Sequence, residues 1–348
     1  MSSKFITCTV AALCSIVTAV LVSHAGPLDP PAGPVASTYK TLTEVEPRIA
    51  INATNTPGDG NSVFKITQPG SYYLTGGFTG VANKHGVEVT VSDVTIDLNG
   101  YRLKGVTGSL DGIHSTSEHI VVVNGAALSW GGSGVSVMGN YSRCEGLRST
   151  GNGANGIETG GGAIVEKCQT STNGGDGIVT SIVAVIHLCE SNGNTGAGIR
   201  TSQSTVDHCA VNHNAPGIIG GSGSNITHCS VTSNSGDGIL VERTCRVAEN
   251  TCSFSAATGS AAGIHATAAD NRIEGNNVVN GDRGIVVDAG GNIIVRNTCS
   301  GNTTDWVLAA NNVFGPIVDR RSPASGAVSG FSASGSTGTT DPNANFSY

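Results

Sequence analysis

Residues 229–239 read Cys-Ser-Val-Thr-Ser-Asn-Ser-Gly-Asp-Gly-Ile, and the spacing within this stretch recurs through most of the chain. A glycine followed by Ile or Val returns in steps of 26, 22, 22, 21, 21, 19, 21, 25 and 21 residues. These marker glycines are Gly86, Gly112, Gly134, Gly156, Gly177, Gly198, Gly217, Gly238, Gly263 and Gly284. A period of this length is typical of a repeat protein in which each unit packs on its neighbours.

A second marker keeps the same period. It is a mostly branched apolar residue followed three positions later by Asn or Cys in nearly every unit. The apolar column reads Ile96, Val121, Cys144, Val165, Ile186, Val206, Ile226, Val247, Ile273 and Ile294. The partner column reads Asn99, Asn124, Leu147, Cys168, Cys189, Cys209, Cys229, Asn250, Asn276 and Asn297. Because Asn tolerates the left-handed conformation, we expect this partner column to mark a bend and to stack as a ladder.

The length of the unit selects the architecture. A unit of 21 residues without helical periodicity is too short for a propeller blade of about 40 residues. It fits three short strands joined by turns, which is one rung of a parallel β-helix. Each rung adds about 4.8 Å, so ten rungs make a rod of about 48 Å. The residue after each marker glycine then points inward, and the glycine itself provides a positive φ or a close backbone approach.

The stretch Val94-Thr95-Ile96-Asp97-Leu98-Asn99-Gly100, together with units such as residues 229–239, resembles the right-handed parallel β-helix repeat of the pectin-lyase-like superfamily. The resemblance covers about residues 60–306. It implies an all-β fold, a single-stranded right-handed parallel β-helix (solenoid) of about ten 21-residue rungs. It also implies that any activity lies on the outer face of one sheet. The repeat encodes the rod and not a reaction, so the activity needs separate arguments.

The segments outside the repeat suggest export. Residues 1–25 have the features of a secretory signal peptide, with Lys4, an apolar run and Ser-His-Ala before Gly26. A retained membrane anchor is the alternative, since the run approaches the length of a spanning helix. With cleavage, the mature chain has no membrane span, and we expect a secreted, extracellular or cell-envelope protein. The expected divisions are 1–25 signal peptide, 26–38 Pro-rich linker, 39–80 N-terminal cap, 81–306 β-helix and 307–348 C-terminal cap or low-complexity tail.

Composition excludes several classes of function. The 348 residues include 50 glycines but only 12% charged residues, and the net charge is −7. This acidic balance argues against a nucleic-acid partner, because such binding depends on neutralising phosphates. The 38% hydrophobic share argues against disorder. We expect a folded monomer.

Eight cysteines remain after residue 25, an even number that often indicates disulfides in a secreted protein. Their positions follow the repeat instead. Cysteines on successive rungs would point the same way from strands about 4.8 Å apart, beyond the usual separation of about 3.5–4.5 Å between disulfide Cβ atoms. We therefore predict a ladder of free, buried thiols.

The first candidate site is the outward row of the strands that follow the marker glycines. This row reads His114, Ser136, Glu158, Val179, Arg200, Ile219, Leu240, His265 and Val286. By resemblance to the superfamily, the active site of a calcium-dependent lyase would contain a cluster of carboxylates with a nearby Arg or Lys. The active site of an inverting glycosidase needs close carboxylates. Glu158 and Arg200 are the catalytic candidates, as acid/base and charge stabiliser, and His114 and His265 are binding candidates. An ordinary solvated face is the alternative.

The second candidate site lies one residue beyond the inner apolar column. Glu145, Glu166, His187, Asp207 and Thr227 follow one another there, with His208 and His228 one position further on. Carboxylate and imidazole together suit Zn or Mn. Glu166, His187 and Asp207 are therefore the predicted metal ligands, with a charge-balanced ladder as the alternative.

Three functions follow from these features. The first is a secreted or cell-surface β-helix that presents a flat sheet surface to a polysaccharide without catalysis. The second is a polysaccharide lyase or glycoside hydrolase of the pectin-lyase-like type, with calcium as a cofactor only for a lyase. The third is a structural spacer or adhesin segment. Whether the protein is an enzyme stays open, and polysaccharide is the expected partner in the first two cases.

Overall fold

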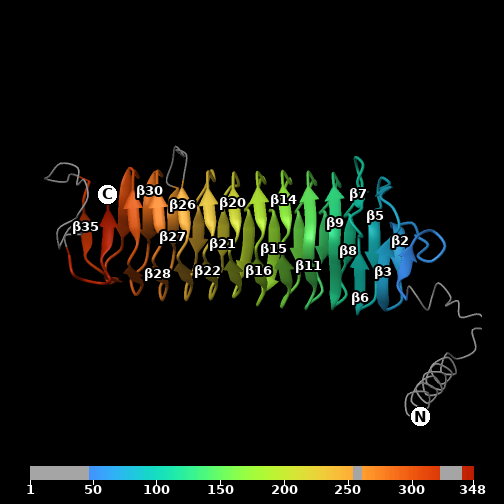
Figure 1. The fold of residues 1–348 in the computed structure, drawn as a ribbon, viewed down its shortest axis with the longest axis horizontal. Coiled ribbons are helices and arrows are strands. Elements are labelled where there is room, and N and C mark those ends of the chain that lie inside the picture. Colours follow the sequence, from blue (N-terminus) through green and yellow to red (C-terminus); the bar gives the residue numbers. More distant parts are fainter. Residues whose placement is uncertain (1–46, 254–260, 322–338) are drawn as a thin grey trace, which may run out of the picture. The chain divides into compact units, whose positions relative to one another are not determined.

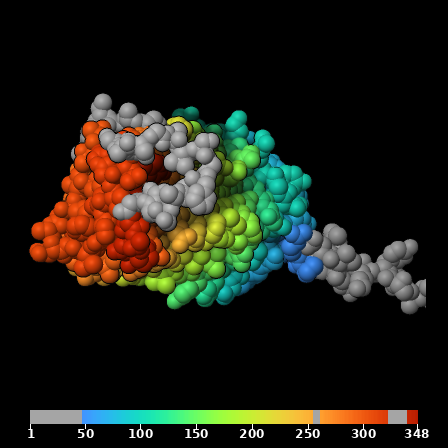
Figure 2. Space-filling view, turned by 60° about the vertical axis from the view of Figure 1, so that its left-hand side comes forward, coloured from blue at the N-terminus to red at the C-terminus, as the bar shows by residue number. Residues whose placement is uncertain are grey.

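The computed structural model describes residues 47–253, 261–321 and 339–348. Arg48–Tyr348 form a compact unit in which parallel strands stack turn upon turn (Figure 1). The space-filling view in Figure 2 shows the turns following one another in chain order. The predicted signal peptide 1–25 and linker 26–38 lie outside the described residues. Within the described residues there is no helix of the length and apolar character that crossing a membrane requires.

A 12-stranded parallel sheet forms the first face of the solenoid. Its strands are β2 (Ser62–Ile66), β5 (His85–Val89), β8 (Ile113–Ser115), β10 (Val135–Val137), β12 (Ile157–Thr159), β15 (Ile178–Ile182), β18 (Ile199–Ser202), β21 (Ile218–Gly220), β24 (Ile239–Val241), β27 (Ala262–Ala266), β30 (Arg283–Val287) and β33 (Thr304–Leu308). One strand per turn gives about twelve turns. The prediction of about ten is close, and β2 and β33 are the additional turns at the two ends.

A 24-stranded sheet bends once in each turn and supplies the second and third faces. The second face contains β1 (Ile49–Ile51), β3 (Gly70–Leu74), β6 (Val94–Asp97), β13 (Ile164–Glu166), β16 (Val185–His187), β19 (Thr205–Asp207), β22 (Asn225–Thr227), β25 (Arg246–Ala248), β28 (Arg272–Glu274), β31 (Ile293–Val295) and β34 (Val313–Phe314). The third contains β4 (Phe78–Thr79), β7 (Arg102–Lys104), β14 (Gln169–Ser171), β17 (Glu190–Asn192), β20 (Ala210–Asn212), β23 (Ser230–Thr232), β26 (Thr251–Ser253), β29 (Asn277–Val279), β32 (Thr298–Ser300), β35 (Ile317–Asp319) and β36 (Asn345–Ser347). Strands β9 (Ile120–Leu128) and β11 (Arg143–Thr150) run through both faces.

Stacked aliphatic side chains fill the interior. The residue after each marker glycine pairs with its counterpart in the next turn, as in Val135 with Ile157, and both are buried. Burying each such side chain is worth about 1.5–3 kcal/mol. The inner apolar column is confirmed with one correction. Val122, not Val121, pairs with Cys144 and is fully buried.

The marker glycines are required by close approach and not by a positive φ. A Cβ on Gly156 would lie 2.5 Å from the carbonyl oxygen of Gly177 in the next turn. The left-handed conformation occurs instead at the bends, including the one between the second and third faces. In the middle and C-terminal turns the residue that adopts it, such as His208, precedes the partner column. Asn99 and Asn124 of the predicted column are themselves left-handed, but Gly125 and not Asn124 pairs with Leu147, so Asn124 also precedes the partner position.

The partner column forms two kinds of ladder. All eight described cysteines are free and buried, as predicted. Cys189 Sγ donates to the Val165 carbonyl of the preceding turn at 3.4 Å. Asn276 Nδ2 donates to the equivalent Val247 carbonyl at 2.9 Å, and its Oδ1 also accepts from the backbone and side chain of Asn250 at 3.0 Å. Asn276 Nδ2 also donates to Asn297 Oδ1 of the next turn at 2.9 Å, so the amide connects three turns, whereas the thiol connects two.

A further asparagine ladder, absent from the sequence prediction, lies at the bend between the third face and the 12-stranded sheet. Each amide there donates to the Oδ1 of its counterpart in the next turn, as Asn173 does to Asn194 at 2.9 Å. Its members are Asn152, Asn173, Asn194, Asn214 and Asn234. This ladder therefore covers the turns in which cysteine occupies the other bend.

Both ends of the rod contain aromatic residues. At the N-terminal end Phe64 and Phe78 make an edge-to-face pair, and Trp130 is buried beside Phe78. At the other end β36 pairs with β32 and β35, and Trp306 Nε1 donates to Ser347 Oγ at 2.8 Å. The terminal strand β36 therefore covers part of the last turns.

Candidate functional site

The outward row of the 12-stranded sheet has the predicted register, so His114, Glu158, Arg200 and His265 all lie on it. The row extends beyond the prediction at its N-terminal end. Lys65 and Glu88 precede His114 there, and neither was among the predicted site residues. Polar and charged groups therefore gather on the first turns of this face.

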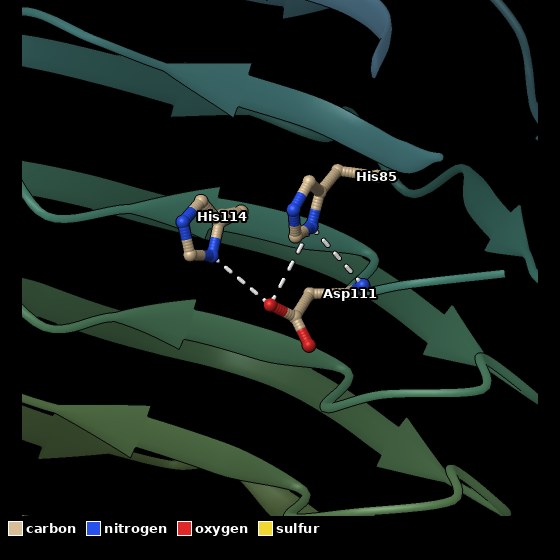
Figure 3. A group of neighbouring side chains, drawn as sticks. All are labelled: His85, Asp111 and His114. Carbon is tan, nitrogen blue, oxygen red and sulfur yellow. Dashed lines mark hydrogen bonds and ion pairs between the residues drawn. The ribbon is translucent and has the colours of Figure 1, made fainter. Parts of the chain in front are cut away.

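The centre of this group is a cluster of His85, Asp111 and His114, here called the His–Asp–His cluster (Figure 3). His114 Nδ1 lies 3.0 Å from Asp111 Oδ2, and His85 Nδ1 lies 3.5 Å from the same oxygen. The two imidazole rings stack with centroids 4.2 Å apart. The other carboxylate oxygen, Asp111 Oδ1, accepts from the Ser133 backbone N–H at 2.7 Å. The next turn thereby orients the carboxylate.

The environment shifts the two imidazoles in opposite directions. The hydrogen bond to Asp111 raises the pKa of His114, although burial opposes it. Burial and the charge of His114 lower the pKa of His85. Burial would raise the pKa of Asp111, but its bonds to His114 and the Ser133 N–H bring it below its usual value. A protonated His114 beside a neutral His85 is an arrangement that can both give and take a proton near neutral pH.

Charged neighbours border the cluster. Lys65 Nζ lies 3.2 Å from Glu88 Oε2 and 2.7 Å from Asp59 Oδ2. On the other side Ser133 Oγ donates to Glu158 Oε2 at 3.5 Å. The predicted acid Glu158 therefore lies at the edge of this cluster.

Arg200 does not join Glu158. Val179 pairs with Arg200 on one side and with Glu158 on the other, so it separates the two in the row. Arg200 Nε instead binds Asp176 Oδ2 at 2.6 Å. The structure thus separates the two predicted catalytic residues, with Arg200 in an ion pair with Asp176 and Glu158 hydrogen-bonded to Ser133.

The predicted binding residue His265 is also paired, through Nδ1 to Asp237 and through Nε2 to Asp288, each at 2.9 Å. Asp237 repeats the arrangement of Asp111. Its Oδ1 accepts a backbone N–H from the next turn and its Oδ2 pairs with a cation of the face. Asp176 likewise accepts the Ala197 backbone N–H at Oδ1 and pairs with Arg200 through Oδ2. The sequence signal for these partners is an Asp directly before a marker glycine, a position that by itself is also typical of a turn.

The second predicted row also has the expected register, from Glu145 through Glu166, His187 and Asp207 to Thr227. Its members separate into two groups. Glu145 and Glu166 both bind Arg143 and Lys167, with contacts of 2.7 to 3.4 Å. Glu166 is therefore neutralised by cations of its own and is not grouped with the other two predicted ligands.

His187 and Asp207 are brought together, and His208 joins them. His187 Nδ1 lies 3.3 Å and His208 Nδ1 2.7 Å from Asp207 Oδ2. His228 Nδ1 approaches the other oxygen, Oδ1, at 2.9 Å. These four residues are called the Asp207 cluster below. Hydrogen bonds from the histidines outweigh burial and hold the pKa of Asp207 well below its usual range.

A basic groove lies at the bend between the second and third faces, near the N-terminal end. Its volume is about 390 Å³. The floor is made of small residues, among them Gly125, whose Cβ would lie 2.4 Å from that of Leu98. Arg102 and Arg148 flank Ala126 in adjacent strands. Among the described residues Arg102 has no side-chain partner, whereas Arg148 Nε donates only to Gln169, at 3.4 Å.

Comparisons with known proteins agree with this architecture. The family model described as "Right handed beta helix region" matches residues 216–319. No curated protein matches the chain. Among solved structures, the A-module of mannuronan C-5 epimerase AlgE6 of Azotobacter vinelandii has 14% identity and a TM-score of 0.52, covering 70% of this chain and 78% of that one.

Two more structures show the same fold. The A-module of the Azotobacter vinelandii epimerase AlgE4 has 14% identity and a TM-score of 0.51, covering 70% of this chain and 90% of that one. The tailspike of Escherichia coli bacteriophage HK620, solved with a hexasaccharide, has 10% identity and a TM-score of 0.52, covering 86% and 71%. The predicted fold is confirmed: the chain is a right-handed parallel β-helix repeat protein.

Proposed function

We propose that the protein is an extracellular or cell-envelope β-helix that binds an acidic polysaccharide, with no need for catalysis. The observation that carries the proposal is the pair of available guanidinium groups, Arg102 and Arg148, on either side of Ala126 in the basic groove. The charged residues of the 12-stranded face mostly bind one another. The groove therefore offers a ligand more free donors than the flat face that the sequence favoured.

The chemistry of the groove favours a carboxylate-bearing sugar. Arg presents a planar fork of N–H donors that matches a carboxylate and stays charged at any physiological pH. Arg102 and Arg148 belong to strands two spacings apart, about 9.6 Å. A chain of repeating uronates would meet both cations without bending. The similar structures support a polysaccharide ligand, since one is a mannuronan epimerase and another was solved with a hexasaccharide.

The test is affinity electrophoresis or calorimetry of purified protein with polymannuronate, polygalacturonate and neutral dextran. We expect binding to the acidic polymers that weakens with salt, and no binding to dextran. The double variant Arg102→Ala/Arg148→Ala should lose at least tenfold in affinity. Arg243→Ala, which removes another exposed arginine, is the control. Unchanged affinity in the double variant would refute the groove as the site.

A second candidate is a polysaccharide lyase acting at the His–Asp–His cluster, favoured by the opposite pKa shifts of His85 and His114. In such a reaction Nδ1 of neutral His85 would exchange its hydrogen bond from the Asp111 N–H for the proton on the carbon next to a uronate carboxylate. The glycosidic C–O bond would break as a C=C bond forms, and protonated His114 would give its proton to the leaving oxygen. Each atom and charge is then accounted for without a further reactant.

Turnover assays separate this candidate from pure binding. Polysaccharides are incubated with the protein, with and without calcium, while ultraviolet absorbance reports unsaturated products and a reducing-end assay reports hydrolysis. A lyase should lose activity in His85→Gln, whereas a hydrolase using the predicted pair should lose it in Glu158→Gln and Arg200→Ala. A spacer or adhesin segment would show neither binding nor turnover.

A further inference from the structure

We infer that His187, Asp207 and His208 form a binding site for one divalent transition-metal ion of the zinc class. The three residues come from the outer row of the second face and the bend that follows it. The inference does not depend on the proposed polysaccharide function, because the site and the basic groove share no residue.

The spacing of the ligand atoms fits such an ion. His187 Nδ1 and His208 Nδ1 lie 3.3 and 2.7 Å from Asp207 Oδ2, and all three atoms lie within 4.8 Å of one another. Zinc binds His nitrogen and carboxylate oxygen at about 2.0–2.2 Å, which places tetrahedral ligands about 3.3 Å apart. Small rotations of these side chains would therefore be enough to surround an ion.

The carboxylate is already oriented for this purpose. Thr227 Oγ1 donates to Asp207 Oδ1 at 2.7 Å, and His228 Nδ1 lies 2.9 Å from the same oxygen. These contacts occupy Oδ1 and leave Oδ2 facing His187 and His208. Metal-binding carboxylates are commonly held in this way by hydrogen bonds to the oxygen that does not bind the metal.

The orientation of the imidazoles distinguishes this site from the His–Asp–His cluster. The rings of His187 and His208 are inclined by 76°, so their nitrogens can converge on one point. The rings of His85 and His114 stack at 22°. In addition, the Asp111 backbone N–H donates to His85 Nδ1 at 3.2 Å, which occupies the lone pair that a metal would need.

The site is open to solvent. The side chains of His187, Asp207 and His208 are 35%, 25% and 52% exposed. A bound ion could therefore exchange with the medium and keep one coordination position for water or a ligand oxygen. Two imidazoles and one carboxylate favour Zn²⁺ or Cu²⁺ over Ca²⁺, which prefers six to eight oxygen ligands.

The experiment is calorimetric titration of untagged, reduced wild-type protein with ZnCl₂, and separately with CaCl₂. We expect one zinc ion to bind and calcium not to compete for it. The double variant His187→Ala/His208→Ala should weaken zinc binding at least tenfold. His213→Ala is the matched control, because His213 is an exposed histidine that is also left-handed and lies next to Asn212 instead of a carboxylate.

A second readout tests the ligand set directly. Co²⁺ bound by this set should give the intense visible absorption of a four- or five-coordinate site, and the double variant should lose it. Asp207→Asn, checked for folding by circular dichroism, provides an independent variant that should also weaken binding. Absence of zinc binding in the wild type, or equal binding in wild type and both variants, would overturn the inference.

Discussion

Two carboxylates on the second face occupy the same outward row three turns apart, and their partners differ. Asp207 is surrounded by three histidines. Glu274, reached through Thr227 and Ala248, is surrounded by three arginines. Its partners Arg246, Arg272 and Arg296 all lie 2.7 or 2.8 Å from it.

The comparison shows that one scaffold position can serve two kinds of chemistry. Arginine stays charged, so the Glu274 group is a permanent ionic network, and its hydrogen bonds from Arg272 outweigh burial and lower the pKa of Glu274 to about 2. Histidine loses its proton near neutral pH and then becomes a metal ligand. The C-terminal turns therefore use the carboxylate for stability, whereas the middle turns keep it available for a ligand.

The same two regions also differ at the adjacent bend. Cysteine thiols lie there in the middle turns and asparagine amides in the C-terminal turns. The middle turns, which lack amides at that bend, have the asparagine ladder from Asn152 to Asn234 at the bend between the third face and the 12-stranded sheet. The C-terminal turns also have Asn271, Asn292 and Asn312 stacked at the bend before the second face, so both regions contain amide ladders but at different bends.

The largest expected effect concerns these ladders. Asn276→Ala should lower the free energy of unfolding by about 3 kcal/mol, because it leaves buried amide and carbonyl groups of neighbouring turns unsatisfied. Cys209→Ala removes one weak thiol donor and should cost only about 1 kcal/mol. Urea denaturation measures both. Equal losses would mean that thiol and amide contribute alike.

The next effect concerns the carboxylates. Glu274→Gln should cost about 2 kcal/mol at neutral pH, because the side chain is only 6% exposed and holds three charged donors. Asp207→Asn should cost less than about 1 kcal/mol, because its imidazole partners are more exposed than the carboxylate of Glu274 and exposed ion pairs contribute little. A larger loss for Asp207→Asn would reverse the assignment of roles.

The pH dependence sharpens the contrast. A carboxylate with a lowered pKa stabilises the fold above its ordinary pKa, and the contribution disappears as pH falls through the lowered value. For Glu274 this window runs from 4.5 down to about 2. The difference in unfolding free energy between wild type and Glu274→Gln should therefore stay constant down to about pH 4.5 and shrink below it. A difference that vanishes already near neutral pH would contradict the guanidinium network as its source.

The smallest effect belongs to the His–Asp–His cluster. His114 has a raised pKa because of Asp111, so its ion pair stabilises the fold below the ordinary histidine pKa of 6.5 and is lost as pH rises through the raised value. We expect His114→Gln to cost less than about 1 kcal/mol at pH 6 and less still at pH 9. Nuclear magnetic resonance titration of His114 and His85 would check the order of their pKa values directly.

The period of the sequence was sufficient to predict the fold and the register of both candidate rows. It failed locally where a unit changes its bend. Asn99 lies in a bend with additional residues before β7, whereas β9 makes the equivalent bend at Asn124 without them. Counting from the asparagine therefore selected Val121 in place of Val122.

The sites were less predictable, for physical reasons. Asp111 and Asp176 precede the strands, and only the next turn reveals that each holds both a backbone N–H and a cation. The basic groove exists because small residues such as Gly125 line its floor, and small residues give no sequence signal of a binding site. Glu166 pairs with Arg143 and Lys167 instead of joining Asp207, and the row pattern does not include these two cations.

The buried thiols have a consequence for how the chain must mature. Burial raises the pKa of residues such as Cys252, to about 12, so the folded protein has almost no reactive thiolate. Before the coil closes, the same sulfurs are accessible to one another and to oxidants. In an oxidising compartment, the β-helix has to fold faster than non-native disulfides form. The yield of refolding should therefore rise when a reductant is present. Burial protects the thiols in the folded protein, and rapid folding protects them before that.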